Sequence, residues 1–217
     1  FGEMYKKKPF FIVFEGVEGC GKSFQSKKLY YTLKKDNIDT ILTREPGGTK
    51  SAELIRDLIL KDYFIKNNKD KFDKYTDTLL YLAARNEHVK SKIRPALLKK
   101  KVVICDRFID STLAYQVYGK QVDIKLINNV HKKILHGIKP NLTFILKVSK
   151  KMSKIRLKKR KTKNRYDNFP QHFYTKAQKS FLKLAKNKKN YYVLDSSSND
   201  NTLEKKIYNI VNKYLNI

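Results

Sequence analysis

Short apolar runs alternate with helix-compatible segments along most of the chain. The runs, rich in aromatic and β-branched residues, are 10–15 (FFIVFE), 39–43, 102–105, 142–148 and 191–194. Runs of this length and composition predict five strands. Because they are continuous rather than alternating with polar residues, they indicate a parallel sheet covered on both faces.

The segments between these runs predict helices. We expect helices over 22–35, 51–60, 77–99, 124–135 and 173–186, and a last one from an apolar stripe at helical spacing between Leu203 and Tyr214. Pro95 predicts a kink or break in the 77–99 helix, and 61–74 is expected to be an exposed, irregular connection. The alternation predicts an α/β fold, in which ligands bind at the carboxyl ends of the strands.

The length of 217 residues fits one domain over 1–217, and a hydrophobic content of 41% is enough for a core. No apolar run approaches the ~20 residues of a membrane span, and the first ten residues lack a secretory signal. Two cysteines, Cys20 and Cys105, do not make a disulfide framework. We therefore expect a reducing, cytoplasmic setting, with both thiols serving as small buried hydrophobes.

The formal net charge of +29 indicates a partner that carries phosphate groups. Lysines dominate this charge, and we interpret most of them as compositional drift on solvated faces. The eight arginines are more informative, because a planar fork grips phosphate or a base edge in two places. Six of them fall within the motifs described below, whereas Arg56 and Arg94 do not and are expected on helix surfaces.

A phosphate-binding loop follows the first predicted strand. The pattern G-x-x-x-x-G-K-[ST] is matched by Gly16, Val17, Glu18, Gly19, Cys20, Gly21, Lys22 and Ser23. Its strand-loop-helix context lets backbone N–H groups and the helix dipole face a nucleoside triphosphate such as ATP. Lys22 would reach the β- and γ-phosphates, and Ser23 would ligate Mg²⁺. Glu18 is unusual among phosphates: it either accepts a hydrogen bond from a sugar hydroxyl or faces solvent.

Three further motifs follow strands or lie on a neighbouring helix. Thr43–Thr49 (TREPGGT) follows the second strand, and Asp106–Phe108 (DRF) follows the third and continues into 111–116 (STLAYQ). On the long helix, Tyr81 and Arg85 are four residues apart and share a face. A ring beside a guanidinium suits stacking on a base and bonding to its edge; the alternative for Tyr81 is an ordinary core aromatic.

These motifs together resemble the thymidylate kinase family, and specifically its bacterial branch, over nearly the whole chain. The resemblance rests on GVEGCGKS, TREPGGT, LAAR, DRF…STLAYQ and a basic segment at about 150–168 that corresponds to a lid. It implies a three-layer P-loop NTPase fold, with a five-stranded parallel sheet, helices on both faces and a mobile basic lid. It also implies ATP and dTMP as substrates, Mg²⁺, and a homodimer.

The resemblance further assigns roles to residues. Glu18 would contact the 3′-hydroxyl of the deoxyribose, Arg44 and Arg107 the acceptor's phosphate, and Asp106 the Mg²⁺ ion. Tyr81 would stack on thymine, Arg85 would hydrogen-bond the base, and Tyr115 would lie under the sugar. Three more pocket residues and three lid arginines, at least one of which would reach the transferring phosphoryl group, complete the assignment: Ser111, Thr112, Gln116, Arg156, Arg160 and Arg165.

The sequence departs from the family pattern at Phe24, Val117, Tyr118 and Lys147, which leaves the pocket rim and the charge on the ATP side undetermined. Two alternatives stay open: another deoxynucleoside or nucleotide kinase of the same fold, and a basic protein that binds nucleic acid. The kinase interpretation predicts no general base, because the acceptor phosphate is already mostly dianionic at neutral pH.

Overall fold

The computed structural model describes residues 8–61, 71–159, 170–198 and 201–216. The predicted lid residues Arg160 and Arg165, the expected mobility of that segment and most of the 61–74 connection therefore lie outside the described residues. In the part that is described, no helix has the length and apolar character needed to cross a membrane.

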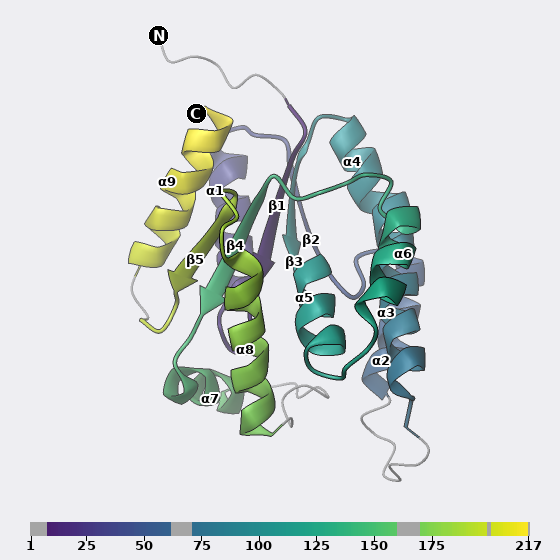
Figure 1. Cartoon of the computed structure of the whole chain (residues 1–217). Coiled ribbons are helices and arrows are strands. Elements are labelled where there is room, and N and C mark those ends of the chain that lie inside the picture. Colours follow the sequence, from purple (N-terminus) through teal and green to yellow (C-terminus); the bar gives the residue numbers. More distant parts are fainter. Residues whose placement is uncertain (1–7, 62–70, 160–169, 199–200, 217) are drawn as a thin grey trace.

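Five parallel strands form the central sheet (Figure 1). They are β1 (Phe10–Glu15), β2 (Thr40–Arg44), β3 (Val102–Asp106), β4 (Leu142–Lys147) and β5 (Tyr191–Asp195). Their spatial order is β2-β3-β1-β4-β5, so β1 lies at the centre between β3 and β4. The predicted fold is confirmed, and the strand boundaries agree with the apolar runs to within one residue.

Helices cover both faces of this sheet (Figure 1). The helical segments are α1 (Lys22–Lys35), α2 (Lys50–Lys61), α3 (Lys74–His88), η3 (Val89–Ile93), α4 (Arg94–Leu98), α5 (Ile109–Thr112), η4 (Leu113–Val117), α6 (Ile124–Ile134), α7 (Lys150–Lys158), α8 (Gln171–Ala185) and α9 (Thr202–Leu215), of which η3 and η4 are π-helical turns.

The alternation of side chains along β1 divides the core in two. Phe10, Ile12 and Phe14 enter a cluster that includes apolar residues of α1, α8 and α9. Phe11 and Val13 enter a second cluster, with residues of η3 and α4. Each face of the central strand is thus sealed by helices, which explains why its sequence is apolar throughout and ends at buried Glu15.

The chain stays helical through Pro95, where the sequence predicts a kink or break. The chain passes from α3 through the π-helical turn η3 into α4, where Pro95 occupies the first turn. Because proline has no N–H to donate, a wider turn just before it accommodates the missing hydrogen bond. The segment 109–117 and the start of the basic segment are also helical, and the latter is capped by Ser149, whose hydroxyl accepts from the Met152 N–H.

Candidate active site

A cavity of about 470 Å³ opens at the carboxyl ends of the strands, as expected for a parallel sheet. Side chains from the loops after β1, β2 and β3 and from α2, α3, α5, η4 and α7 line it. The sequence-predicted site residues among them are Glu18, Gly19, Gly21, Lys22, Ser23, Arg44, Tyr81, Arg85, Asp106, Arg107, Ser111, Thr112, Tyr115, Gln116 and Arg156. The structure therefore brings three separate motifs and the long helix together around one space.

The phosphate loop needs glycine at its tight turns. Gly16 has φ +138°, and a Cβ there would lie 2.5 Å from the Leu146 carbonyl oxygen of β4. Gly19 has φ +73°, and its Cβ would lie 2.9 Å from the carbonyl oxygen of Ser153 on α7. Any side chain would therefore push the loop away from the neighbouring backbone, in addition to the strain of a positive φ.

Lys22 and Ser23 begin α1 directly after the loop. The buried Lys22 ammonium donates to the Val17 carbonyl oxygen at 2.9 Å, which keeps its charge inside the curve of the loop. The Ser23 hydroxyl donates to Asp106 Oδ2 at the end of β3, and Asp106 Oδ1 is buried with no hydrogen-bond partner among the described residues. A hydroxyl beside a carboxylate with a spare oxygen is a donor set that fits Mg²⁺.

Glu18 faces the cavity rather than solvent. Its carboxylate accepts from Arg107 Nη2 and from the Tyr115 hydroxyl, both at 2.7 Å. Burial and the charge of Glu18 raise the pKa of Tyr115, which keeps that phenol protonated as a donor. The Arg107 guanidinium lies 5.3 Å from the centre of the Tyr115 ring. Glu18 thus joins the loop to the DRF segment, and the solvent-facing alternative is wrong.

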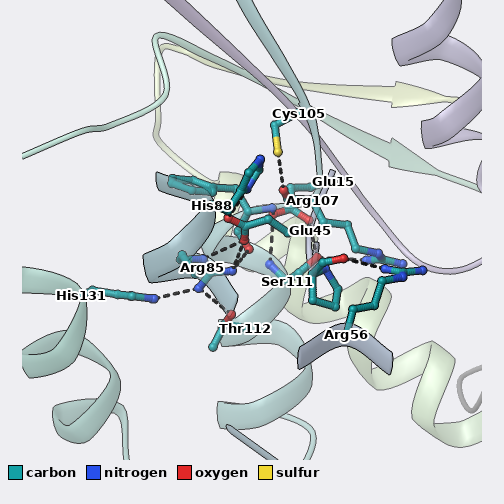
Figure 2. A network of polar contacts seen from close by, with 12 residues as sticks. Glu15, Glu45, Arg56, Arg85, His88, Cys105, Arg107, Ser111, Thr112 and His131 are labelled. Carbon is teal, nitrogen blue, oxygen red and sulfur yellow. Dashed lines mark hydrogen bonds and ion pairs between the residues drawn. The ribbon is translucent and has the colours of Figure 1, made fainter. Parts of the chain in front are cut away.

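Arg85 lies at the centre of a buried polar network (Figure 2). Its Nε donates to Glu45 Oε2 at 2.8 Å, and Nη2 lies 2.7 Å from the same oxygen. Nη2 also donates to the Phe108 carbonyl oxygen, and Nη1 contacts Thr112 Oγ1 and His131 Nε2, each at 2.8 Å. Four hydrogen bonds and the ion pair with Glu45 therefore occupy most of this guanidinium within the protein. A contact with a base would draw on the same planar fork.

Glu45, His88 and His131 complete this network. The sequence analysis gave none of these three residues a role. His88 contacts Glu45 Oε1 at 3.1 Å and the Thr43 hydroxyl at 2.6 Å. Burial, reinforced by the charge of Arg85, lowers the pKa of His131 to about 3. A neutral imidazole can accept the Arg85 N–H, whereas an imidazolium could not. Only the packing of α6 against α3 brings His131 to this position.

Arg56 corrects the expectation of a helix-surface residue. It lines the cavity from α2, and its Nη1 donates to the Pro46 carbonyl oxygen at 2.7 Å. Burial and the nearby charge of Arg44 lower the pKa of its guanidinium. Arg44 pairs with Glu53 at 2.9 Å. Arg44 and Arg56 are thus two neighbouring cations on this side of the cavity. The sequence signal that could have indicated this role for Arg56 is the three-residue spacing of Glu53 and Arg56, which puts them on one side of α2. Arg94, by contrast, is exposed as expected.

Arg156 of α7 contacts the backbone of the phosphate loop. Its Nη1 donates to the Gly19 carbonyl oxygen at 3.3 Å, and its Nη2 donates to the carbonyl oxygens of Ser196 at 2.7 Å and Ser198 at 3.2 Å. Ser153 adds a hydrogen bond to the Glu18 carbonyl oxygen. The first helix of the basic segment is therefore packed against the loop and the segment after β5.

The departures from the family pattern have separate consequences. Phe24 is more than half exposed and lines the cavity. Lys147 pairs with Asp195 at 3.4 Å, so two partly exposed opposite charges stand at the ends of β4 and β5. Tyr118 packs beneath Lys183 of α8 and is not among the described residues that line the cavity.

Comparisons with known proteins agree with this geometry. The thymidylate kinase family model matches residues 14–207. A thymidylate kinase from Wolbachia pipientis wMel is 44% identical over 178 residues, covering 81% of this chain and 84% of the relative. One from Halothermothrix orenii is 38% identical over 204 residues, covering 93% and 95%. The crystal structure of thymidylate kinase from Ehrlichia chaffeensis superposes with a TM-score of 0.74 at 31% identity, covering 94% of this chain and 99% of that one. With its motifs gathered around one cavity and these relatives spanning most of its length, the chain belongs to the thymidylate kinase family.

Proposed function

We propose that the protein is a phosphotransferase that moves the γ-phosphoryl group of ATP to dTMP, giving ADP and dTDP for dTTP biosynthesis. One observation carries the proposal: a single cavity joins a triphosphate-binding loop to a second set of cations and a ring-and-guanidinium pair. Such an arrangement suits two nucleotides whose phosphates meet, with one base held on the far side.

On the donor side, residues 16–23 would hold the triphosphate through backbone N–H groups, and Lys22 would turn from Val17 to the β- and γ-phosphates. Ser23 and Asp106 would hold Mg²⁺, which supplies positive charge against the phosphate oxygens when it is bound. Arg156 would approach the phosphates from α7. The family roles of Arg160 and Arg165 remain predictions outside the described residues.

On the acceptor side, Arg107 and Arg44 would grip the 5′-phosphate, and Glu18 would accept a hydrogen bond from the 3′-hydroxyl. Tyr81 would stack on thymine, with Arg85 and Thr112 at the edge of the base. Three side chains on α5 and η4 would line the sugar and base pocket: Ser111, Tyr115 and Gln116. Arg56, which lines the same cavity, would be a further cation near the acceptor phosphate.

The chemistry requires position more than proton transfer. An acceptor phosphate with a second pKa near ~6 is already nucleophilic at neutral pH, so no side chain needs to act as a base. Lys22, Arg107 and Arg156 would neutralise charge on the migrating group, and the walls of the cavity would keep out water that could otherwise accept it.

The proposal is tested by measuring ADP release with ATP and each of dTMP, dUMP, dCMP, dGMP and AMP. We expect dTMP to have the highest kcat/KM. Preference for another monophosphate would favour the alternative of a different kinase of the same fold, and salt-dependent DNA binding without phosphoryl transfer would favour a nucleic-acid-binding protein.

We also propose that the protein is a homodimer that pairs through α2, α3 and α6. Large apolar side chains are exposed at four-residue spacing on α2 and α3, and one more on α6: Leu54, Leu58, Tyr75, Leu79 and Ile124. These helices lie side by side on one face of the sheet (Figure 1). Exposed apolar side chains gathered on neighbouring helices commonly mark an interface.

Substitution of Leu54 and Leu58 by glutamate is expected to convert the dimer to a monomer, because burying two carboxylates at an apolar contact is unfavourable. Light scattering coupled to size exclusion measures the mass directly. Tyr31→Glu, on α1 at the other face, is the matched control and should remain dimeric. A monomeric unmodified protein, or a dimer that tolerates both glutamates, contradicts this interface.

A cytoplasmic location is part of the proposal. Cys20 and Cys105 are both buried and unbonded to each other, in keeping with a reducing compartment.

A further inference from the structure

Glu15 is a buried carboxylate that lies at the end of β1, outside the set of residues that line the cavity. Its Oε1 accepts from the backbone N–H groups of Phe108 at 2.8 Å and Ser111 at 3.1 Å, and its Oε2 accepts from the Ser111 hydroxyl at 2.5 Å. All three donors belong to the segment that follows β3 (Figure 2). Three donors offset part of the cost of burying this carboxylate. The phosphoryl-transfer steps proposed above do not use Glu15.

The segment that Glu15 holds contains Arg107 in a strained conformation. Arg107 has φ +73°, a left-handed value that is uncommon for a residue with a side chain. Such residues cost about 1–3 kcal/mol and persist where neighbouring groups over-determine them. Here the Arg107 N–H donates to the Phe14 carbonyl oxygen at 2.9 Å, and Glu15 holds the next N–H along the chain. Two successive residues of β1 therefore fix both sides of the turn.

The same carboxylate also reaches the head group of Arg107 through one hydroxyl. Ser111 Oγ donates to Glu15 and accepts from Arg107 Nη1 at 2.9 Å. Arg107 Nη1 donates in addition to the Gly16 carbonyl oxygen at 3.0 Å. Glu15 therefore fixes the direction in which the Ser111 hydroxyl hydrogen points. With its hydrogen directed at Glu15, Ser111 Oγ presents a lone pair to the Arg107 guanidinium.

We propose that Glu15 is a positioning residue for phosphoryl transfer: it presets the backbone and guanidinium of Arg107 for the acceptor's phosphate. This inference rests on the role proposed for Arg107. Glu15 itself does not touch either nucleotide; it acts through the turn and through Ser111.

The charge balance around Glu15 makes this positioning dependent on pH. Burial and the neighbouring Asp110 raise the pKa of Glu15 to about 7, and Arg107 opposes them. Cys105 of β3 and Tyr191 of β5 also face it, while Lys188 and Arg85 act on Asp110. A proton on Oε2 would point at Ser111 Oγ, which would then accept twice and lose the acceptor for its own hydrogen. The hydrogen-bond relay from Glu15 through Ser111 to Arg107 thus needs ionised Glu15. It weakens as the pH falls through about 7.

Glu15→Gln places an amide NH₂ or oxygen where the relay needs two carboxylate oxygens, and it cannot titrate. At pH 8.5 we expect this variant to raise KM for dTMP roughly 10-fold or more, the size of one lost hydrogen bond to a charged group, with KM for ATP within about 2-fold. As the pH is lowered to 6, the wild-type KM for dTMP should rise towards that of the variant. At each pH, the KM for dTMP of Glu15→Gln is divided by that of the wild type. The titration of dTMP affects both values equally and cancels in this ratio. Glu15→Asp should keep a pH-dependent KM.

Two further variants separate the possible failures. Arg107→Lys tests the proposed function: if it leaves KM for dTMP unchanged, the role of Arg107 is wrong. If Arg107→Lys raises that KM while Glu15→Gln matches wild type at pH 8.5, the inference about Glu15 is overturned and the function stands. Ser111→Ala keeps the carboxylate and both backbone bonds, so it decides the matter even if Glu15→Gln fails to fold. Ser111 also lines the proposed pocket, so a higher KM for dTMP alone does not decide the matter. The deciding result is the pH dependence of that KM, which should flatten in Ser111→Ala; a wild-type pH dependence would refute the proposed link from Glu15 through Ser111 to Arg107.

Discussion

Replacement of Lys22 by alanine is expected to lower kcat by roughly 10²–10³-fold or more, with the dissociation constant for dTMP changed by no more than about 2-fold. Lys22 is buried at the curve of the phosphate loop, and its donation to the Val17 carbonyl oxygen holds the ammonium close to where the phosphates would lie. Its charge counts most when the migrating group carries the most negative charge. In the proposed binding mode, the acceptor's base and sugar would lie against other residues.

The turnover rate is measured by coupled ADP release, and dTMP binding by calorimetry. Lys27→Ala is the matched control, since Lys27 lies on the exposed side of the same helix above the Tyr31 ring. It should leave both quantities unchanged. A loss of dTMP affinity as large as the loss of kcat would show that Lys22 serves the acceptor rather than the transfer step.

Arg85→Lys is expected to raise KM for dTMP roughly 10-fold or more, with KM for ATP changed less than about 2-fold. The guanidinium is only 3% exposed and satisfies four acceptor groups at once: Glu45, Phe108, Thr112 and His131. An ammonium has three donors and no planar fork, so it would leave some of these buried acceptors without a partner. The free energy of unfolding should therefore also fall, by about 2–4 kcal/mol.

Steady-state kinetics with each substrate varied in turn, together with urea unfolding, measures both effects. Arg94→Lys is the control, because Arg94 is exposed at the start of α4. Equal losses for dTMP and ATP would mean that Arg85 acts only on stability. An unchanged KM for dTMP would mean that Arg85 does not hydrogen-bond the base.

Much of the fold was predictable because its signals are local. The apolar run at 10–15, the glycines of 16–21 and Lys22 form a strand, a turn and a helix from neighbouring residues alone. Because parallel strands end at one edge, the motifs after β1, β2 and β3 could be expected to meet. Periodicity missed three short helical segments, α5, η4 and α7, because none of them is long enough to show a repeating apolar pattern. It also did not reveal that the helix predicted over 77–99 contains the π-helical turn η3 just before Pro95.

The presence of a residue in the cavity was predictable where a single motif carries that residue, as with Lys22 or Arg107. The contacts of a residue were not predictable where the partner of a charge comes from elsewhere in the chain. Arg56 seemed a surface residue until α2 was placed beside the loop after β2, and His131 seemed an isolated histidine until α6 brought it to Arg85. Glu15 looked like the last residue of a strand, because the groups it binds are more than ninety positions away.

Local sequence signals were enough to predict a phosphate-binding loop at the end of a parallel sheet, because loop, strand and helix signals act over a few residues. Which buried charges face one another depends on how distant segments pack. Hydrogen bonds to a carboxylate depend on distances of about 3 Å, and the packing of distant segments sets those distances.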